Sequence, residues 1–417
     1  MGQKRKIAIV GGGASGMVAA IMAAREGASV TLFEQKERLG KKILSTGNGR
    51  CNYTNANMDI SCFRGEELSI VEHVLRRFGT EDTLRFFEKL GIVPKERNGY
   101  YYPQSDQAAA VLDVLCMEIR RLHVMVHCQT KVLSIQKRKD FVIRTSEGQF
   151  HADAVILSTG GQASPVLGSD GSGYALAKAL GHHMTPVVPA LVQLHGKGTF
   201  FKMVSGVRVD AKVSLYAEGE RLASDFGEVQ LTNYGISGIP VFQISRYAAM
   251  ALYEKKRPVV KLDFMPKYSE RELLTFLKER RAYDFEKTAE EFFIGMLNRK
   301  LIPVLLRASA IRQEQSLKEV TAEDLERFAK KCKAFEIEIT GTNSFEQAQI
   351  CAGGIRTREI HPETLESRIV QGLYLTGELL DVDGICGGYN LQWAWATGTI
   401  AGMEAAAPKK GTRNDSN

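Results

Sequence analysis

Apolar and glycine positions at the start of the chain alternate in an order that predicts a strand, a tight turn, a helix and a second strand. Lys6–Val10 is a short apolar run typical of a buried strand, and it leads directly into a glycine-rich turn. An alanine-rich helix pattern covers 17–26, and a second predicted strand, Ser29–Phe33, ends on Glu34. This order is the fingerprint of a dinucleotide-binding βαβ unit.

The turn has the spacing G-x-G-x-x-G, and each glycine has its own physical reason. Gly11 permits a tight turn, Gly13 lets the backbone approach a pyrophosphate, and Gly16 lets the helix pack on the sheet. The helix start, with Ala14 and Ser15, would turn N–H groups and partial positive charge toward the phosphates. Glu34, 18 residues after Gly16 and followed by Gln35, can accept hydrogen bonds from ribose hydroxyls. A glycine turn that binds nothing would not explain this acid.

The rest of the first 190 residues continues the α/β pattern. Helices are predicted over 67–78, 81–90 and 107–122, and strands over 124–128, 132–136, 141–145, 149–151 and 154–157. From about 191 the pattern changes to period-two alternation, clearest over 207–217, which is typical of half-buried antiparallel strands. Shorter segments of the same kind are 228–232 and 259–263. Capping boxes at Ser269 and Thr321 predict helices that end near 281 and 333.

The first pattern returns from about 346, with a strand over 372–378 and a long helix over 390–407. We therefore expect an α/β fold: a Rossmann-like FAD-binding domain of two sequence halves, 1–190 and 346–407, with an inserted β-barrel-like plus helical substrate or cap domain over 191–345. The polar residues 408–417 are predicted to be a disordered tail.

Composition narrows the class of protein. The 417 residues are 44% hydrophobic and 25% charged, and no apolar run is long enough to span a membrane. The charged N-terminus is followed by a strand and turn rather than a signal peptide. Seven scattered cysteines without a C-x-x-C motif predict free thiols in a reducing cytoplasm, and no metal site is predicted. The net charge of +7 is mild, and without a basic–aromatic alternation a nucleic-acid partner is not expected. The pattern predicts no oligomeric state.

Three further segments favour FAD over NAD as the dinucleotide. The first follows Glu34 and offers glycines and polar donors: Lys42, Gly47, Gly49, Arg50, Cys51 and Asn52. The second ends the strand over 154–157 with Thr159 and Gly160. The third combines Gly377 and Glu378 with Gly388, Asn390 and Leu391 at the start of the last helix, whose positive end would face the flavin N1/C2 carbonyl. Each segment alone also fits an ordinary loop or a helix that closes the core.

Taken together, these segments resemble the BaiN-like, or aminoacetone-oxidase-like, family of FAD-dependent oxidoreductases over nearly the whole chain. The most specific matches are 42–52 with 54–55, and 377–378 through 387–392; 168–174 and 352–355 also match. The resemblance implies FAD contacts at Ser15, Glu34, Arg50, Cys51, Asn52, Glu378, Asn390 and Leu391, and a backbone contact from Val132 to adenine. It also implies a histidine where this chain has Asn233.

The motifs also limit the chemistry. The chain has no second G-x-G-x-x-G between a strand and a helix. The glycine-rich residues 168–173 follow no strand, so we interpret them as a loop and predict no separate NAD(P)H domain. NAD(P)H is expected only as a transient hydride donor to flavin N5. The leading hypothesis is reduction of an unsaturated or carbonyl-conjugated small molecule. The alternatives are an amine oxidase that uses O2, a tRNA-binding or tRNA-modifying flavoprotein suggested by the positive charge, and a flavin-holding sensor.

No residue pattern identifies the proton donor. Cys386 and Tyr389 rank first because they adjoin the third flavin segment, and Tyr102 is a further candidate. His195, Arg208 and Arg246 qualify by residue type alone. For all six a structural role is the default interpretation, and for Cys51 packing is favoured over a redox role.

Overall fold

The computed structural model describes residues 4–283 and 286–407, and the predicted tail, 408–417, lies outside them. The chain divides into two compact units. The first unit comprises residues up to 187 together with those from 350, and the second comprises 188–349. The insertion predicted over 191–345 therefore falls inside the second unit.

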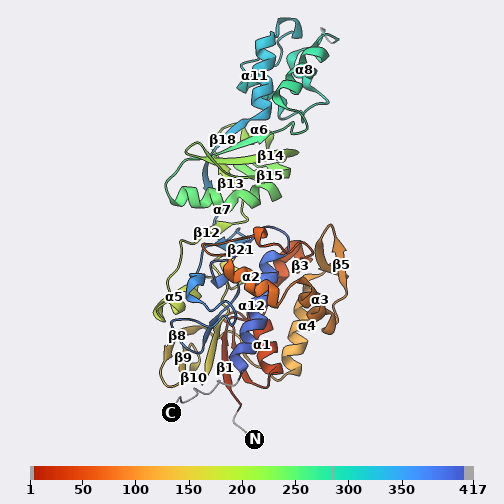
Figure 1. Ribbon diagram of the computed structural model, residues 1–417. Coiled ribbons are helices and arrows are strands. Elements are labelled where there is room, and N and C mark those ends of the chain that lie inside the picture. The colour runs from red at the N-terminus through yellow and green to blue at the C-terminus, as the bar shows by residue number, and fades with distance from the viewer. Residues whose placement is uncertain (1–3, 284–285, 408–417) are drawn as a thin grey trace, which may run out of the picture. The chain divides into compact units, whose positions relative to one another are not determined.

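A five-stranded parallel sheet forms the centre of the first unit (Figure 1). Its order is β20 (Leu373–Leu375), β11 (Ala154–Leu157), β1 (Lys6–Val10), β2 (Ser29–Phe33) and β7 (Met125–His127). The three middle strands are almost fully buried because helices cover the sheet, as in other parallel sheets. In the register Val10 pairs with both Phe33 and Leu157, so the loops after β1, β2 and β11 leave the sheet at one edge.

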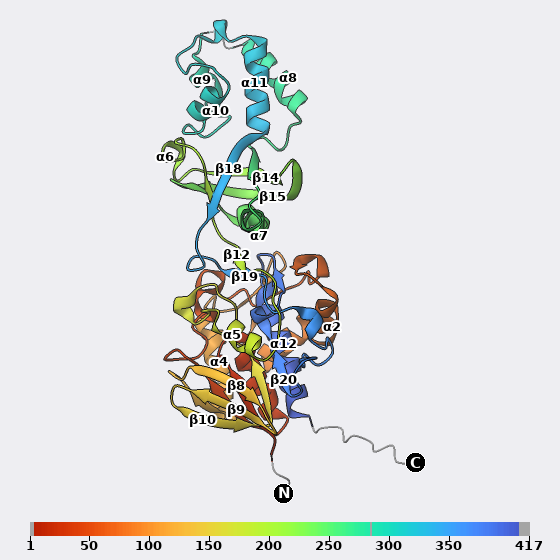
Figure 2. The same ribbon diagram turned by 90° about the vertical axis from the view of Figure 1, so that its left-hand side faces the viewer.

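Two helices from opposite ends of the sequence pack side by side, and this contact joins the two sequence halves (Figures 1 and 2). They are α1 (Ala14–Arg25) and α12 (Tyr389–Ala406). A Cβ atom at Gly398 would lie 2.3 Å from Ser15 O, and one at Gly402 would lie 2.5 Å from Ala19 O. Only glycine allows the helix backbones to approach this closely. The contact holds the end of the chain against the predicted phosphate turn.

The remaining elements of the first unit surround this centre. An antiparallel sheet of three strands contains β8 (Val132–Lys137), β9 (Phe141–Thr145) and β10 (Gly148–Ala152). Shorter strands are β3 (Thr54–Asn55), β4 (Phe63–Arg64), β5 (Pro94–Arg97), β6 (Tyr100–Pro103), β19 (Ile350–Ala352) and β21 (Asp383–Gly384). The further α-helices are α2 (Ser69–Arg77), α3 (Thr80–Lys89), α4 (Ala108–Arg121) and α5 (Ser172–Ala179). Short 3-10 helices are η1 (Ile43–Gly49), η2 (Ile60–Cys62), η3 (Pro165–Leu167), η5 (Thr357–Glu359) and η6 (Gly377–Leu379).

The second unit is built on a closed barrel of six strands. In barrel order these are β13 (Leu194–Gly196), β16 (Gly235–Ser237), β15 (Glu220–Leu231), β14 (Arg208–Ala217), β17 (Pro258–Asp263) and β18 (Phe335–Thr342). Its other elements are β12 (Val188–Ala190), α6 (Phe201–Val204), α7 (Ile239–Tyr253), α8 (Glu270–Arg281), α9 (Ala289–Phe293), α10 (Ile302–Ala308), η4 (Leu317–Glu319) and α11 (Ala322–Lys333). The capping boxes predicted at Ser269 and Thr321 open α8 and α11. The expected α/β fold class, with a Rossmann-type sheet and a barrel, is confirmed.

Three local features differ from the sequence prediction. The strand predicted over 228–232 is the end of the longer β15, and none of the first nine residues of β15 is buried. The segment interpreted as a loop, 168–173, ends inside α5, because Gly171 at a φ of 76° redirects the chain and Asp170 Oδ1 accepts the Ser172 N–H at 3.0 Å. The strand β18 follows α11 directly and was not predicted.

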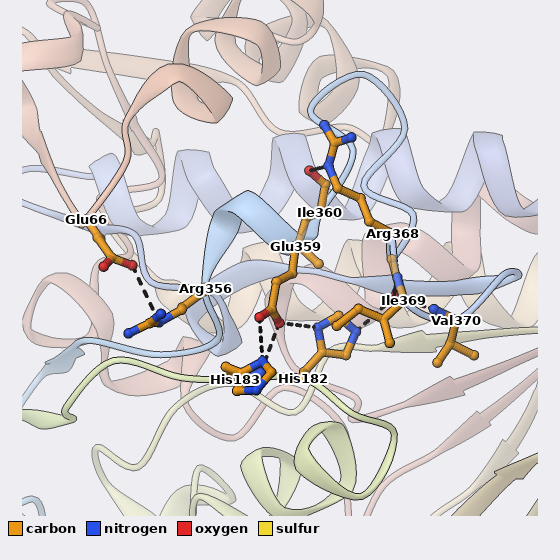
Figure 3. A network of polar contacts seen from close by, with 10 residues as sticks. Glu66, His182, His183, Arg356, Glu359, Ile360, Arg368, Ile369 and Val370 are labelled. Atoms are coloured by element: carbon orange, nitrogen blue, oxygen red, sulfur yellow. Dashed lines mark hydrogen bonds and ion pairs between the residues drawn. The ribbon is translucent and has the colours of Figure 1, made fainter.

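A network of polar contacts stabilises the loop beside β20, the edge strand of the parallel sheet (Figure 3). The Ser367 N–H donates to Leu373 O at 2.7 Å, so this segment continues the pairing beyond β20. His182 lies between Glu359 Oε2, 3.0 Å from its Nδ1, and Ser367 Oγ, 2.9 Å from its Nε2. His183 Nδ1 is 2.8 Å from Glu359 Oε1. This order of serine, histidine and glutamate resembles a catalytic triad, but Ser367 Oγ is buried and accepts the N–H groups of Ile369 and Val370. The network therefore holds a loop.

Within the described ranges, none of the helices is long and apolar enough to cross a membrane.

Candidate functional site

The three glycines of the first turn have different surroundings. Gly11 has a φ of 102°, and a Cβ there would lie 2.5 Å from Ser158 O. A Cβ at Gly16 would lie 1.9 Å from Gly11 O, so this position permits only glycine. A Cβ at Gly13, in contrast, would meet nothing within 4 Å. The backbone at Gly13 therefore borders open space at the carboxyl edge of the sheet.

The start of α1 suits an anionic group in that space. Gly13 is the N-cap residue, no side chain caps the helix, and the first turn carries no acidic residue. The backbone N–H groups there, with the positive end of the helix dipole, are donors for a pyrophosphate. Ala14 and Ser15 form the first helical positions, and Ser15 is buried. These residues fit the phosphate part of a dinucleotide.

Glu34, directly after β2, is buried and firmly held. Its Oε2 accepts the Gly12 N–H and its Oε1 accepts the Lys36 N–H, both at 2.8 Å. Burial raises the pKa of this carboxyl group, although both backbone bonds oppose the effect. Each oxygen keeps a second acceptor position, which a ribose hydroxyl could use.

Segments around Glu34 form the expected adenosine side of the site. Gln35 Nε2 donates to Gly168 O at 2.7 Å, and Thr130 N–H donates to Glu34 O at 2.9 Å. Val132 follows two residues later as the first residue of β8, and it is buried. The structure thus brings Glu34, Gln35 and the stretch that leads to Val132 together.

Glu378 lies in η6, one residue after a glycine that contacts the start of α1. A Cβ at Gly377, where φ is 64°, would lie 2.8 Å from Ser15 Oγ. Glu378 Oε2 pairs with Lys42 Nζ at 2.8 Å, and Oε1 accepts the Cys351 N–H at 2.8 Å. Gly377 N–H donates to Thr397 Oγ1 of α12 at 3.0 Å. The predicted residues Lys42, Gly377 and Glu378 therefore form one cluster with the phosphate turn.

The glycine-rich segment after Lys42 folds as η1 with several left-handed residues. Gly47 and Gly49 have φ values of 55° and 80°, and Cys51 has 59°. The Cys51 side chain is buried, and burial raises the pKa of its thiol to about 12, which keeps it protonated. The Cys51 side chain therefore has a packing role rather than a redox role. Arg50 beside it is exposed.

The segment 47–52 also meets the beginning of α12. The Asn52 amide, oriented to satisfy its neighbours, donates to Tyr101 O at 3.1 Å and Thr54 O at 3.0 Å. A Cβ at Gly388 would lie 2.8 Å from Thr54 O and 2.9 Å from the side-chain amide of Asn52. Asn390 clamps the preceding turn through two 2.8 Å bonds to the backbone of Gly384. Leu391 follows it, partly buried.

The end of β11 contributes Thr159 and Gly160. A Cβ at Gly173 would lie 1.8 Å from Thr159 Oγ1, and one at Gly160 would lie 2.9 Å from Ser169 Oγ. The segment 168–174 therefore covers this strand end. Every predicted cofactor residue lies in the first unit, on or beside loops at the carboxyl ends of its strands, where α/β sheets bind ligands.

The candidate proton donors have less distinctive surroundings. Tyr389 is buried with its ring 5.9 Å from that of Phe63, and burial raises its pKa. Tyr102 is half-buried on β6 beside Gly47, and burial raises its pKa as well. Cys386 is half-buried in the turn before α12.

The remaining three candidates belong to the second unit. His195 Nε2 lies 2.6 Å from Asn343 Oδ1, and Arg208 pairs with Glu228 at 2.7 Å on the surface. Arg246 lies over the ring of Tyr247 at 5.3 Å. These contacts are structural, and none of the six candidates stands out as a proton donor.

Sequence reasoning missed two residues beside Glu378. Cys351 donates its N–H to the carboxylate, and Tyr174 lies next to Gly161 in the same cluster. Tyr174 ends the segment 168–174 that matched the family, and Cys351 immediately precedes the matched segment 352–355. Their proximity to Glu378 depends on the tertiary packing of segments that are far apart in the sequence, which no local pattern reveals.

Comparisons with known proteins identify the family to which the chain belongs. The profile of the HI0933-like protein Rossmann domain matches residues 5–404. The 3-dehydro-bile acid delta(4,6)-reductase of Clostridium scindens is 52% identical over 96% of this chain and 99% of its own length. The ribosomal RNA dihydrouridine synthase of Escherichia coli is 28% identical over 96% of this chain and 98% of its own.

A solved structure agrees at the level of the fold. The 3-ketosteroid delta1-dehydrogenase from Sterolibacterium denitrificans has a TM-score of 0.50 and 11% identity, covering 97% of this chain and all of that one. With the family profile and the reductase relative, the resemblance noted in the sequence is confirmed. The chain belongs to the HI0933-like Rossmann family, and it is an oxidoreductase of the flavoprotein type.

Proposed function

We propose that this protein is an FAD-dependent reductase that saturates a carbon–carbon double bond conjugated to a carbonyl group, with NAD(P)H as the electron donor. The substrate class we favour is a small, largely apolar 3-oxo steroid acid. The observation that carries the proposal is the 52% identity, over nearly both full lengths, to a protein named as a 3-dehydro-bile acid delta(4,6)-reductase.

The geometry of the first unit supports FAD as the cofactor. The N–H groups at the start of α1 would hold the pyrophosphate, and Glu34 would accept the ribose hydroxyls. Lys42 would neutralise Glu378 beside the polyol part of the cofactor. Bound FAD would supply the hydride-transfer centre. The chain's own task is to orient this group, place the positive end of α12 near it and exclude water.

A ribosomal RNA substrate is the second candidate function. Two relatives, 28% and 27% identical, are named as ribosomal RNA dihydrouridine synthases. Dihydrouridine differs from uridine by saturation of a double bond that is conjugated to a carbonyl group, so both names describe the same type of reduction. The higher identity to the bile acid reductase favours the small molecule. The net charge of +7 is too mild to favour the RNA.

A comparison of acceptors under one set of conditions distinguishes these functions. The holoprotein is reduced anaerobically with NADPH or NADH and then mixed with a 3-oxo-Δ4,6 bile acid, with unmodified ribosomal RNA, or with oxygen. We expect reoxidation by the bile acid at least tenfold faster than by the RNA. Reoxidation by the RNA alone would replace the first function by the second. Reduction by aminoacetone but not by NAD(P)H would instead support the amine oxidase.

A further inference from the structure

One buried phenol in the first unit has no partner of its own. Tyr174 lies in the first turn of α5 and is 6% exposed. Among the described residues, its hydroxyl is one of the few buried side-chain groups without a hydrogen bond. A buried polar group without a partner costs free energy, and folded proteins rarely leave one unless a ligand or water completes it. The position of this hydroxyl therefore calls for a partner.

The hydroxyl lies beside Gly161, where any larger residue would crowd it. A Cβ at Gly161 would lie 3.1 Å from Tyr174 OH, 3.2 Å from Cys351 Sγ and 3.2 Å from Glu378 Cδ. Three polar groups from α5, β19 and η6 thus converge beside the end of β11. Thr159 and Gly160, the two preceding residues, were assigned to the cofactor on sequence grounds. The orphan hydroxyl therefore borders the proposed FAD site.

The chemistry of the cluster selects the kind of partner. Glu378 already accepts from Lys42 and from the Cys351 N–H, and each of its oxygens keeps one acceptor position. The Cys351 thiol stays neutral because burial raises its pKa to about 12, and its Sγ accepts the Gln162 N–H at 3.1 Å. An alcohol can accept from the phenol and donate to the carboxylate. A phosphate oxygen can only accept, and it would meet the carboxylate charge.

We propose that the Tyr174 hydroxyl binds a hydroxyl group of the ribityl chain of FAD, with Glu378 as the second partner of that group. The inference rests on the proposed FAD cofactor and adds a contact that the sequence analysis did not assign. Tyr174 is therefore a cofactor-binding residue whose hydroxyl is satisfied only in the holoprotein.

Tyr174→Phe tests this through two readouts that do not require turnover. In the apoprotein the variant loses no hydrogen bond, so its midpoint of unfolding in urea should equal or exceed that of the wild type. Its dissociation constant for FAD, measured by calorimetry, should rise about five- to tenfold, as expected for one lost hydrogen bond. Affinity falls without any loss of apoprotein stability, which a purely structural tyrosine would not produce.

Tyr374→Phe is the matched control. Tyr374 is equally buried, at 4% exposure, but its hydroxyl donates to Glu404 O at 3.4 Å. This variant should lower the midpoint of unfolding and leave the FAD dissociation constant unchanged. An FAD analogue that lacks one ribityl hydroxyl gives a second arm. If the analogue lacks the hydroxyl that Tyr174 contacts, the Tyr174→Phe variant should bind this analogue no more weakly than the wild type does, because the contact is already lost.

Two results with Tyr174→Phe alone would overturn the inference while the proposed function stands: wild-type FAD affinity, or a loss of apoprotein stability as large as that of Tyr374→Phe. If every deoxy analogue adds its full loss to that of the variant, the contact is not with the ribityl chain and the inference is wrong. A wild-type protein that binds no FAD would overturn the proposed function together with the inference.

Discussion

At the scale of single residues, the two outer glycines of the first turn are dictated by close contacts inside the protein, whereas Gly13 borders open space. Gly13 has a φ of −80°, which any residue can adopt. Gly16 has no room for a Cβ beside Gly11 O. Substitutions at Gly13 and Gly16 can therefore distinguish an effect on cofactor binding from an effect on folding.

We expect Gly13→Ala to fold with wild-type stability but to bind FAD at least tenfold more weakly, because the methyl group occupies space meant for the pyrophosphate. Gly16→Ala should instead lower the free energy of unfolding by roughly 2 kcal/mol or more, because the helix must move away from the turn. Urea unfolding of both apoproteins, with FAD titrations, checks the pair. Equal FAD affinity of Gly13→Ala and wild type would rule out a pyrophosphate at this position.

Glu34 gives a second prediction at this scale. Glu34→Gln keeps the shape of the side chain but removes its charge, so we expect FAD to bind about tenfold more weakly. Glu26→Gln, at the far end of α1, is the control and should leave the affinity unchanged. If fluorescence titration gives the two variants the same affinity, Glu34 does not bind the ribose.

At the scale of elements, the contact of α1 with α12 makes one domain of two distant sequence segments. Gly398→Ala would place a Cβ 2.3 Å from Ser15 O and force the helices apart. We expect both a lower free energy of unfolding, by about 1–3 kcal/mol, and weaker FAD binding, since Ser15 belongs to the phosphate turn. Denaturation with and without saturating FAD measures both effects. A variant that loses neither would show that the helices do not need close contact.

The network at the edge of β20 predicts a pH dependence of stability. Burial lowers the pKa of His182, so the folded state prefers neutral histidine, and its contribution is present above about pH 6.5 and lost as the pH falls. For Glu359, burial raises the pKa, but the bonds from His183 and His182 outweigh it and the net pKa is lowered. Its contribution is lost at still lower pH, so both groups destabilise the fold in acid.

The measurement is the free energy of unfolding in urea between pH 7.5 and pH 5. It should fall toward pH 5 in the wild type, and the slope should flatten in His182→Gln. His123→Asn, which changes an exposed histidine, serves as the control and should keep the wild-type slope. A slope that is the same in all three proteins would contradict the role of His182.

Sequence patterns predicted the elements whose signals are local. The βαβ unit, the helix over 107–122 and the capping boxes depend on neighbouring residues, and they lie within three positions of their predicted bounds. The strand β18 and the cluster of Tyr174, Cys351 and Glu378 depend on long-range packing instead. The glycine spacing predicted a cofactor site. The hydrogen-bond partner of each carboxylate oxygen could be identified only from the folded structure.

At the scale of the whole molecule, the chain consists of two units with different parts in the proposed function. The first unit holds every residue assigned to FAD, and the second is a barrel with helices whose role as a substrate or cap domain is a proposal. Salt dependence of RNA binding tests the alternative substrate at this scale. We expect weak binding to ribosomal RNA at about 150 mM salt, measured by filter binding, because the net charge of +7 is mild. Tight, steeply salt-dependent binding would favour the RNA substrate.

Anaerobic absorbance of the purified holoprotein tests whether the protein carries FAD and accepts electrons from NAD(P)H. We expect a yellow protein whose absorbance band at about 450 nm, typical of oxidised flavin, bleaches on addition of NADH or NADPH. A yellow protein that stays yellow would contradict the NAD(P)H donor. A colourless protein that releases no flavin on denaturation, and takes up none when FAD is added, would contradict the account as a whole.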